Sequence, residues 1–245
     1  MNKLKSAIKK LVFRYITPPV VYSPIANNSN SQTGEDRIVA YLFSSMKIDH
    51  ISYLDIGAGD PVCSNNTYFF YTNNGKGILV EPDSNVNDRT KAVRPDDLII
   101  NAAISDDTNE EADFFIFNDP SLNTLSEQEA KLRTNSGVYQ LLEKKRIKLI
   151  TIENIIKDYL NGQIPDLISL DVEGMDYKVL NSFNFENYPV PVWIVETCTY
   201  SENHVKPKVT SIIDLMLSKG YFVYADTYIN TIFVNRFWFE NYRAG

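Results

Sequence analysis

Short runs of apolar residues recur along the chain, and the stretches between them carry apolar positions at helical spacing. Short and nearly continuous apolar runs are typical of strands that are buried on both faces of a parallel sheet. Such runs lie at residues 51–56, 78–80, 98–104, 167–170 and 193–195. Two further runs, at residues 221–224 and 231–235, are separated by a short polar turn, which indicates an antiparallel hairpin.

Helices are predicted before and between these strands. An apolar stripe within residues 38–46 predicts the first helix of the domain, with Thr33 as its N-cap and an acidic first turn. Residues 112–117 are expected to form a further strand or a hairpin arm. Residues 119–137 are polar and poorly patterned, which favours a long surface segment of the kind that often serves as a lid or binding loop. Further helices are expected at residues 65–71, 151–159 (N-cap Thr151), 177–183 and 209–218.

The alternation of strands and helices predicts an α/β fold of the Rossmann-like type. We expect a doubly wound, mostly parallel seven-stranded sheet with helices on both faces and one antiparallel strand near an edge. The 245 residues are enough for one such domain with a full core. We assign the domain to residues 31–245, preceded by a basic helix and a polar linker at residues 1–30.

The turn after the first strand carries the clearest chemical signal. Residues 53–60 read Tyr-Leu-Asp-Ile-Gly-Ala-Gly-Asp, so Gly57 and Gly59 follow a buried strand directly. Glycines at such a turn permit positive φ and a close approach of the backbone to a ligand. The second strand ends at Glu81, where a carboxylate can accept hydrogen bonds from both hydroxyls of a ribose. Together these features predict a site for an adenosine-bearing cofactor.

Two residues of this region select among such cofactors. A dinucleotide-binding fingerprint requires a third glycine, and Val62 occupies that position. Asp55 places a carboxylate beside the loop, where it would repel a diphosphate and attract a cation. S-Adenosylmethionine carries an ammonium and a sulfonium group and no phosphate, so we favour it over a nicotinamide or flavin dinucleotide. A glycine turn without a ligand is the remaining interpretation.

Acidic residues recur where the predicted strands end. The carboxyl ends of parallel strands lie at one edge of the sheet, so these residues should lie near one another. A cluster of anions repels itself unless a cation or a donor-rich ligand occupies it, and helix capping alone does not explain such a cluster. The residues are Asp55, Glu81, Asp106, Asp171 and Glu196.

Net charge and cysteine content exclude some classes of protein. The formal net charge of −7 argues against a general nucleic-acid binder, which usually has a basic surface. Cys63 and Cys198 are far apart and lack metal-ligand spacing, so a reducing, cytoplasmic setting is expected. No signal peptide is predicted, and no apolar run approaches the ~20 residues that span a bilayer.

The N-terminal region differs from the rest in charge. Residues 1–34 contain five basic residues and no acidic one, and apolar side chains between Leu4 and Tyr15 share one face of a predicted helix. Such a helix suits weak peripheral contact with the inner face of an anionic membrane, or with an acidic partner. We favour the alternative, in which the helix packs its apolar side on the domain, because single short basic helices bind membranes weakly.

Several short motifs lie between about residues 31 and 197, among them Ser31-Gln32, Glu35-Asp36, Glu81-Pro82 and the Asp-Val-Glu-Gly block at 171–174. In these motifs the chain resembles the FkbM family of methyltransferases. Members typically show a Ser-Gln…Glu-Asp helix start, Asp-Ile-Gly-Ala followed by Pro and Asn-Thr…Phe-Tyr, then Glu-Pro, and finally Asp-Val-Glu-Gly. Two departures stand beside the glycine loop: Asn65 where Ser is usual, and Asn74-Gly75 where Gly-Trp is common. The matching residues are Ser31-Gln32, Glu35-Asp36, 55–58, Pro61, Asn66-Thr67, Phe70-Tyr71, Glu81-Pro82 and 171–174.

The resemblance implies a class I methyltransferase that uses S-adenosylmethionine and methylates a hydroxyl oxygen, often on a sugar or a polyketide-type natural product. Its partner would then be a small-molecule or glycan hydroxyl acceptor, and no nucleic acid is expected. Cofactor binding is assigned to Asp55, Gly57, Ala58, Gly59, Asn66, Thr67, Glu81, Pro82, Ser105, Asp106 and Asp171.

Removal of the acceptor proton requires a base. Position at the strand ends makes Asp171, Glu173 and Glu196 the candidates, and His204 follows the fifth strand as an alternative. Asp171 and Glu173 are also candidate ligands for Mg²⁺, since carboxylate oxygens bind this ion. The bound metal would then bind a diol of the acceptor and acidify it. The alternative to both roles is a structural one, in which Glu173 caps the following helix. The rival functions are an inactive methyltransferase fold that serves as a binding module, and a dinucleotide-dependent oxidoreductase.

Overall fold

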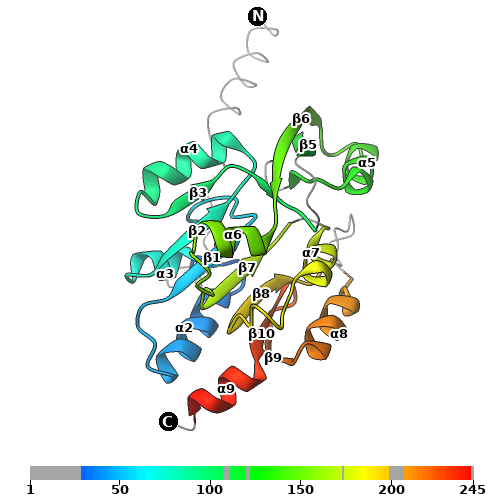
Figure 1. Cartoon of the computed structure of the whole chain (residues 1–245). Helices are drawn as coiled ribbons and strands as arrows, with labels where there is room; N and C mark the ends of the chain where they lie inside the picture. Colours follow the sequence, from blue (N-terminus) through cyan, green and yellow to red (C-terminus); the bar gives the residue numbers. More distant parts are fainter. Residues whose placement is uncertain (1–28, 107–110, 120–121, 173, 199–206, 244–245) are drawn as a thin grey trace, which may run out of the picture.

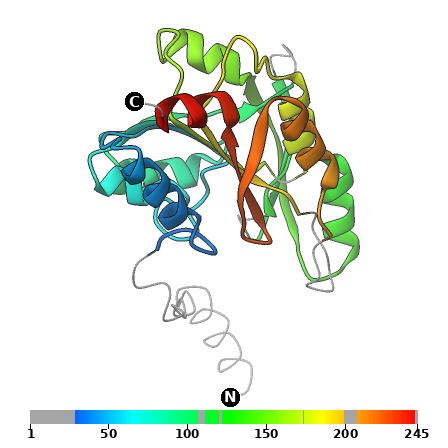
Figure 2. The same ribbon diagram turned by 90° about the horizontal axis from the view of Figure 1, so that it is seen from below.

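The computed structural model describes residues 29–106, 111–119, 122–172, 174–198 and 207–243. Seven of the described strands form one central sheet with helices on both of its faces (Figure 1, Figure 2). The order of its strands is β3-β2-β1-β7-β8-β10-β9. Their bounds are β1 (Ser52–Ile56), β2 (Lys76–Val80), β3 (Leu98–Ile100), β7 (Leu167–Leu170), β8 (Val192–Glu196), β9 (Tyr221–Asp226) and β10 (Asn230–Asn235).

The pairing of the strands confirms the predicted sheet. β3, β2, β1, β7 and β8 pair in parallel, and β10 runs antiparallel between β8 and the edge strand β9. The parallel strands read as continuous apolar runs because helices cover both faces. One face is covered by α6 (Ile152–Asp158), α7 (Asp176–Ser182) and α8 (Thr210–Ser218), and the other by α2 (Glu35–Ser45), α3 (Tyr68–Thr72) and α9 (Arg236–Arg243).

A smaller sheet of order β4-β6-β5 accompanies the central one. β4 (Ala103–Ile104) pairs in parallel with β6 (Leu141–Ile150), and β5 (Glu111–Phe117) pairs antiparallel with β6. The prediction of one strand over residues 98–104 is therefore wrong, because the chain leaves the central sheet after Ile100 and enters the smaller one at Ala103. The prediction of an additional strand at residues 112–117 is confirmed.

The pattern of apolar positions did not predict β6. Its outward side chains form ion pairs with β5: Lys144 Nζ lies 2.8 Å from Asp113 Oδ2, and Arg146 Nε lies 3.5 Å from Glu111 Oε2. Such cross-strand charge pairs stabilise an exposed sheet face. They also replace the apolar alternation by which a strand is recognised, which explains why the sequence pattern missed it.

The pattern also missed three helices. α4 buries Val86 together with Asn87 and Thr90, so no apolar stripe marks it. α5 lies inside the segment expected to be irregular, and it buries only Ala130 and Arg133. The three helices are α4 (Ser84–Val93), α5 (Glu127–Asn135) and α9.

Helix starts were predicted with mixed success. Thr151 caps α6 as expected, since its hydroxyl accepts a hydrogen bond from the N–H of Asn154 at 3.2 Å. Thr33 does not cap α2, because Gly34 takes the N-cap position with a φ of 97°. The hydroxyl of Thr33 instead donates a hydrogen bond to Glu35.

Candidate functional site

The turn after β1 brings the backbone of Gly57 against the end of β7. Gly57 has a φ of 74°, and its N–H donates to the carbonyl oxygen of Val80 at 3.0 Å. A Cβ atom at this position would lie 1.8 Å from the carbonyl oxygen of Asp171. Only glycine fits here, and this is how the ends of β1, β2 and β7 come together at one point.

Glu81 follows β2 and lies beside this turn. Its carboxylate accepts hydrogen bonds from the N–H of Gly59 at 3.1 Å and from the N–H of Asp83 at 2.8 Å. Burial raises the pKa of Glu81 to about 7, although these two backbone donors act in the opposite direction. Protonated and ionised forms of Glu81 are therefore both populated near neutral pH.

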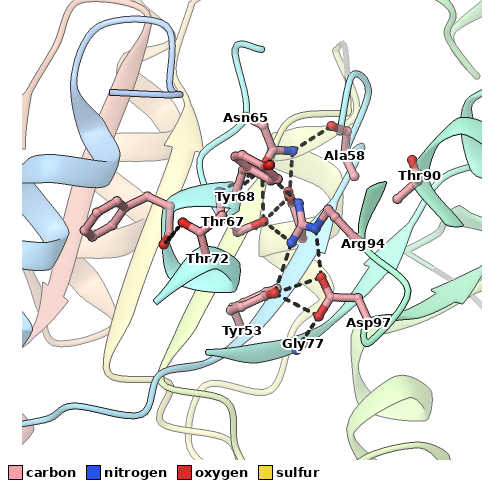
Figure 3. A network of polar contacts seen from close by, with 12 residues as sticks. Tyr53, Ala58, Asn65, Thr67, Tyr68, Thr72, Gly77, Thr90, Arg94 and Asp97 are labelled. Atoms are coloured by element: carbon pink, nitrogen blue, oxygen red, sulfur yellow. Dashed lines mark hydrogen bonds and ion pairs between the residues drawn. The ribbon is translucent and has the colours of Figure 1, made fainter. Parts of the chain in front are cut away.

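A buried polar network supports the turn from behind (Figure 3). Asp55 accepts hydrogen bonds from Asn65 Nδ2 at 3.1 Å and from Thr67 Oγ1 at 2.6 Å. Arg94 donates to Asn65 Oδ1 at 3.1 Å and to Thr67 Oγ1 at 2.9 Å. Asn65 Nδ2 also donates to the carbonyl oxygen of Ala58 at 3.0 Å, which fixes the backbone of the turn itself.

Two buried carboxylates share the charge of Arg94. Arg94 Nε lies 2.8 Å from Asp97 Oδ2, and neither side chain is exposed to solvent. Burial raises the pKa of Asp55, and the charge of Arg94 opposes that shift. Because Asn65 and Thr67 serve this network, the helix expected at residues 65–71 is α3 and begins only at Tyr68.

A cavity of about 440 Å³ opens at the carboxyl ends of β1 and β2. Its volume falls within the range of small-molecule sites, about 300–1,000 Å³. The side toward β2 and β3 is mostly apolar, with Val80, Pro82, Val86 and residues 102–104. The side toward β7 is more polar. The remaining described residues that line the cavity are Gln32, residues 56–60, Cys63, Ser64, Glu81, Arg89, Phe114, Asp119, residues 123–125 and residues 171–172.

The smaller sheet and the segment before α5 supply one wall of this cavity. Phe114 of β5, Asp119 and residues 123–125 belong to that wall. Arg133 of α5 is fully buried and donates a hydrogen bond to the carbonyl oxygen of Leu122, which holds the segment in place. The segment predicted to be a lid or a binding loop thus contributes directly to the cavity.

The cavity brings together six of the residues predicted to bind a cofactor: Gly57, Ala58, Gly59, Glu81, Pro82 and Asp171. Other predicted residues are described but do not belong to its wall: Asp55, Asn66, Thr67, Ser105, Asp106 and Glu196. Glu173 and His204 lie outside the described residues. Their predicted roles as base, metal ligand or helix cap stay predictions.

Local structure explains these placements near β1. Asp55 and Thr67 face the network behind the turn, where they bind each other and Arg94. Asn66 Nδ2 donates to Ser169 Oγ of β7 at 3.0 Å. These side chains therefore support the turn that lines the cavity, and they do not line it themselves.

The crossing of the chain between the two sheets explains the placements near β3. The N–H of Ser105 donates to the carbonyl oxygen of Ile150 in the smaller sheet at 2.9 Å, and Asp106 is exposed beyond it. Residues 102–104 take the position in the cavity that was expected for this pair. Glu196 is buried at the end of β8, opposite Asn230 of β10.

Sequence reasoning missed other residues of the wall. Arg89 lies one turn after Val86 on the same face of α4, so its position becomes clear only once α4 is recognised. Phe114 and residues 123–125 depend on the docking of the smaller sheet. Gln32 precedes α2 in the Ser-Gln pair noted in the sequence, but that pair alone suggested no role.

The described residues contain no group of three His, Cys, Asp or Glu side chains that could hold a metal ion. Asp171 is the only predicted Mg²⁺ ligand among them, so the Mg²⁺ hypothesis gains no support. Of the helices in the described ranges, none has the length and apolar character needed to cross a membrane. The predicted basic N-terminal helix lies outside those ranges.

Comparison with known proteins gives one informative match. A family model described as "Methyltransferase FkbM domain" matches residues 55–223, more than half of the chain. No curated protein matches the chain.

Solved structures show only a distant likeness. A putative caffeoyl-CoA O-methyltransferase from Staphylococcus aureus is 10% identical with a TM-score of 0.44, covering 95% of this chain and 98% of that one. A TehB-like SAM-dependent methyltransferase from Corynebacterium glutamicum is 10% identical with a TM-score of 0.41, covering 95% of this chain and 99% of that one. At this level of similarity the two structures carry no information on activity.

Proposed function

Because the chain belongs to the FkbM family of S-adenosylmethionine-dependent methyltransferases, we propose that it methylates a hydroxyl of a sugar, a glycan or a related natural product. The composition of the cavity carries this proposal. One cavity contains Glu81 with the glycine turn, the carboxylate of Asp171, and the polar side chains of Asp119 and Asn123. A cofactor, a proton acceptor and hydrogen-bonding groups suited to a polyol can therefore meet in it.

The residues on the β2 side of the cavity suit an S-adenosyl group. The carboxylate of Glu81 is placed to accept hydrogen bonds from ribose hydroxyls. Pro82, Val86 and the small residues at 102–104 offer an apolar slot for a flat base. A Cβ atom on Gly59 would meet nothing nearer than the carbonyl oxygen of Gly57 at 3.9 Å, so a ligand can approach the backbone of the turn closely at Gly59.

Bound S-adenosylmethionine supplies a methyl group on a positively charged sulfur, and the sulfur keeps the bonding electron pair when the acceptor oxygen attacks. The protein must align the acceptor and take up its proton. We assign the uptake of the hydroxyl proton to the carboxylate of Asp171. Asp119 and Asn123 would orient neighbouring hydroxyls, while Phe114 and Leu125 exclude water from that wall.

An acceptor panel tests this function. The protein is incubated with methyl-labelled S-adenosylmethionine and with neutral monosaccharides and methyl glycosides, beside matched amines and thiols. We expect new O-methyl signals from a hydroxyl acceptor only. Methyl transfer confined to nitrogen or sulfur would overturn O-methylation. A protein that binds S-adenosylhomocysteine and methylates none of the acceptors would support the inactive binding module.

Asp171→Asn is measured in the same assay. A role in proton uptake predicts that the rate falls by about a hundredfold or more, while the affinity for S-adenosylhomocysteine is unchanged. Asp158→Asn, an exposed change on α6, is the control and should turn over normally. Normal turnover by Asp171→Asn would remove Asp171 from the mechanism.

A further inference from the structure

The segment before α2, residues 29–33, forms a strap that is fastened at three places. The first is Asp36 in the first turn of α2. Its Oδ1 accepts hydrogen bonds from Ser29 Oγ at 2.6 Å and Ser31 Oγ at 3.0 Å, and its Oδ2 accepts one from the N–H of Asn30 at 2.7 Å. Asp36 is fully buried, so these charge-assisted bonds are shielded from water and strong.

Glu35 fastens the other end of the strap to the β9–β10 hairpin. Its carboxylate accepts hydrogen bonds from Thr227 Oγ1 at 2.6 Å, from the N–H of Thr33 at 2.9 Å and from Asn230 Nδ2 at 2.9 Å. Burial would raise the pKa of Glu35, but these hydrogen bonds outweigh burial and lower it below the usual value. The carboxylate is therefore ionised at neutral pH and holds the strap and the hairpin together.

The third fastening joins the strap to the glycine turn. The N–H of Asn65 donates to the carbonyl oxygen of Asn30 at 2.9 Å, and Asn65 Nδ2 holds the carbonyl oxygen of Ala58. The strap therefore runs from the turn after β1 to the hairpin of β9 and β10. In the order of the sheet, it lies on the side of β1 that faces β7 and β8, away from β2.

Gln32 is the exception within this fastened segment. Ser29, Asn30, Ser31 and Thr33 all make hydrogen bonds that hold the strap. In the part of the chain that the structure describes, Gln32 makes none, and its side chain belongs to the wall of the cavity. The strap thus holds the backbone on both sides of Gln32 and leaves its amide available to a ligand.

We propose that Gln32 binds the amino-acid end of the cofactor and fixes the position of its sulfur. This inference rests on the proposed function, since it takes S-adenosylmethionine as the ligand of the cavity. With the ribose at Glu81 and the base in the apolar slot toward β3, the homocysteine part extends from β1 toward β7. The strap places Gln32 on that side and Asp171 follows β7, and both residues line the cavity.

The chemistry of a primary amide suits this end of the ligand. A glutamine side chain carries two N–H donors for a carboxylate and a carbonyl acceptor for an ammonium group. The cofactor's amino-acid group carries both charges. Because three fastenings hold the strap before the ligand arrives, little backbone conformational entropy is lost when Gln32 engages it. Gln32 is then a cofactor-binding residue that aligns the methyl group without taking part in bond making.

Two ligands that differ only at the amino-acid end test the proposal. S-Adenosylhomocysteine carries that group, and 5′-methylthioadenosine lacks it. Calorimetric titration should show that Gln32→Ala weakens binding of S-adenosylhomocysteine about 10- to 100-fold, the effect of removing hydrogen bonds to charged groups. Binding of 5′-methylthioadenosine should change less than about twofold. Gln163→Ala, an exposed glutamine change elsewhere, should affect neither ligand.

The outcomes separate the inference from the function on which it rests. Equal loss of both ligands, or no loss of either, would overturn the role of Gln32. Failure of the wild-type protein to bind S-adenosylhomocysteine would instead refute the proposed cofactor. Gln32→Asn, which shortens the side chain and keeps the amide, should weaken only S-adenosylhomocysteine and by less than Gln32→Ala. An equal melting temperature for all variants shows that the fold is unchanged.

Discussion

Gly57 allows β1, β2 and β7 to end at one point, because its Cα atom carries a hydrogen atom where other residues carry a Cβ atom. The constraint is steric, since the carbonyl oxygen of Asp171 occupies the place of a Cβ atom. At Glu81 the constraint is electrostatic, because the hydrogen-bond donors to this buried carboxyl group from the described residues are two backbone N–H groups. Both residue types were visible in the sequence. The protonation state of Glu81 could not be predicted from the sequence, because it depends on how deeply the neighbouring turn buries the carboxyl group.

Gly57→Ala should destabilise the protein by about 3 kcal/mol or more, since the new methyl group forces the ends of β1 and β7 apart. Gly162→Ala is the matched control, because Gly162 also has a positive φ, 78°, and open space around it. Its cost should be only that of a left-handed conformation, about 1–2 kcal/mol. Denaturant titration measures both changes. Equal costs would contradict the close contact at Gly57.

The pKa of Glu81 predicts a pH dependence of cofactor binding. With a pKa of about 7 in the free protein, Glu81 is largely protonated at pH 6 and largely ionised at pH 8. Ribose hydroxyls need the ionised form as acceptor, so binding should release a proton, and affinity should rise as the pH increases through 7. Titration of S-adenosylhomocysteine at pH 6, 7 and 8 measures this rise. A flat profile would contradict it, and Glu81→Gln should abolish the dependence.

At the scale of elements, Arg94 connects parts of the chain that the central sheet alone would leave separate. It follows α4 and reaches the residues before α3, Tyr53 of β1 and Asp97 before β3. The central strands were predictable because burial on both faces makes each one a continuous apolar run. α4, α5 and β6 were not, since polar networks and charge pairs determine their buried or paired positions.

Arg94→Met should destabilise the protein by about 3–5 kcal/mol, because it leaves the buried carboxylates of Asp55 and Asp97 without a cation. Lys131→Met is the control, since Lys131 pairs with Glu127 at the surface with side chains 68% and 67% exposed. Exposed pairs contribute about 0–1 kcal/mol. Thermal unfolding compares the two variants, and similar losses would show that the buried network adds little.

At the scale of the whole molecule, three parts of the chain that are distant in sequence converge on one cavity. The central sheet contributes the glycine turn and Glu81, and the strap contributes Gln32. The smaller sheet contributes Phe114, and the segment before α5 contributes residues 123–125. The first contribution was predictable from a local motif. The others were not, because they depend on how the strap and the smaller sheet pack against the carboxyl ends of the central strands.

The central claim is that this cavity binds S-adenosylmethionine with its ribose at Glu81. The most direct test is a calorimetric titration of the wild-type protein and of Glu81→Ala with S-adenosylhomocysteine, with NADH as the rival ligand. We predict that the wild type binds S-adenosylhomocysteine and not NADH. Loss of the charge-assisted ribose contact in Glu81→Ala should weaken binding by about 1.5–3 kcal/mol. Unchanged affinity in a folded Glu81→Ala variant, or binding of NADH in place of S-adenosylhomocysteine, would contradict the claim.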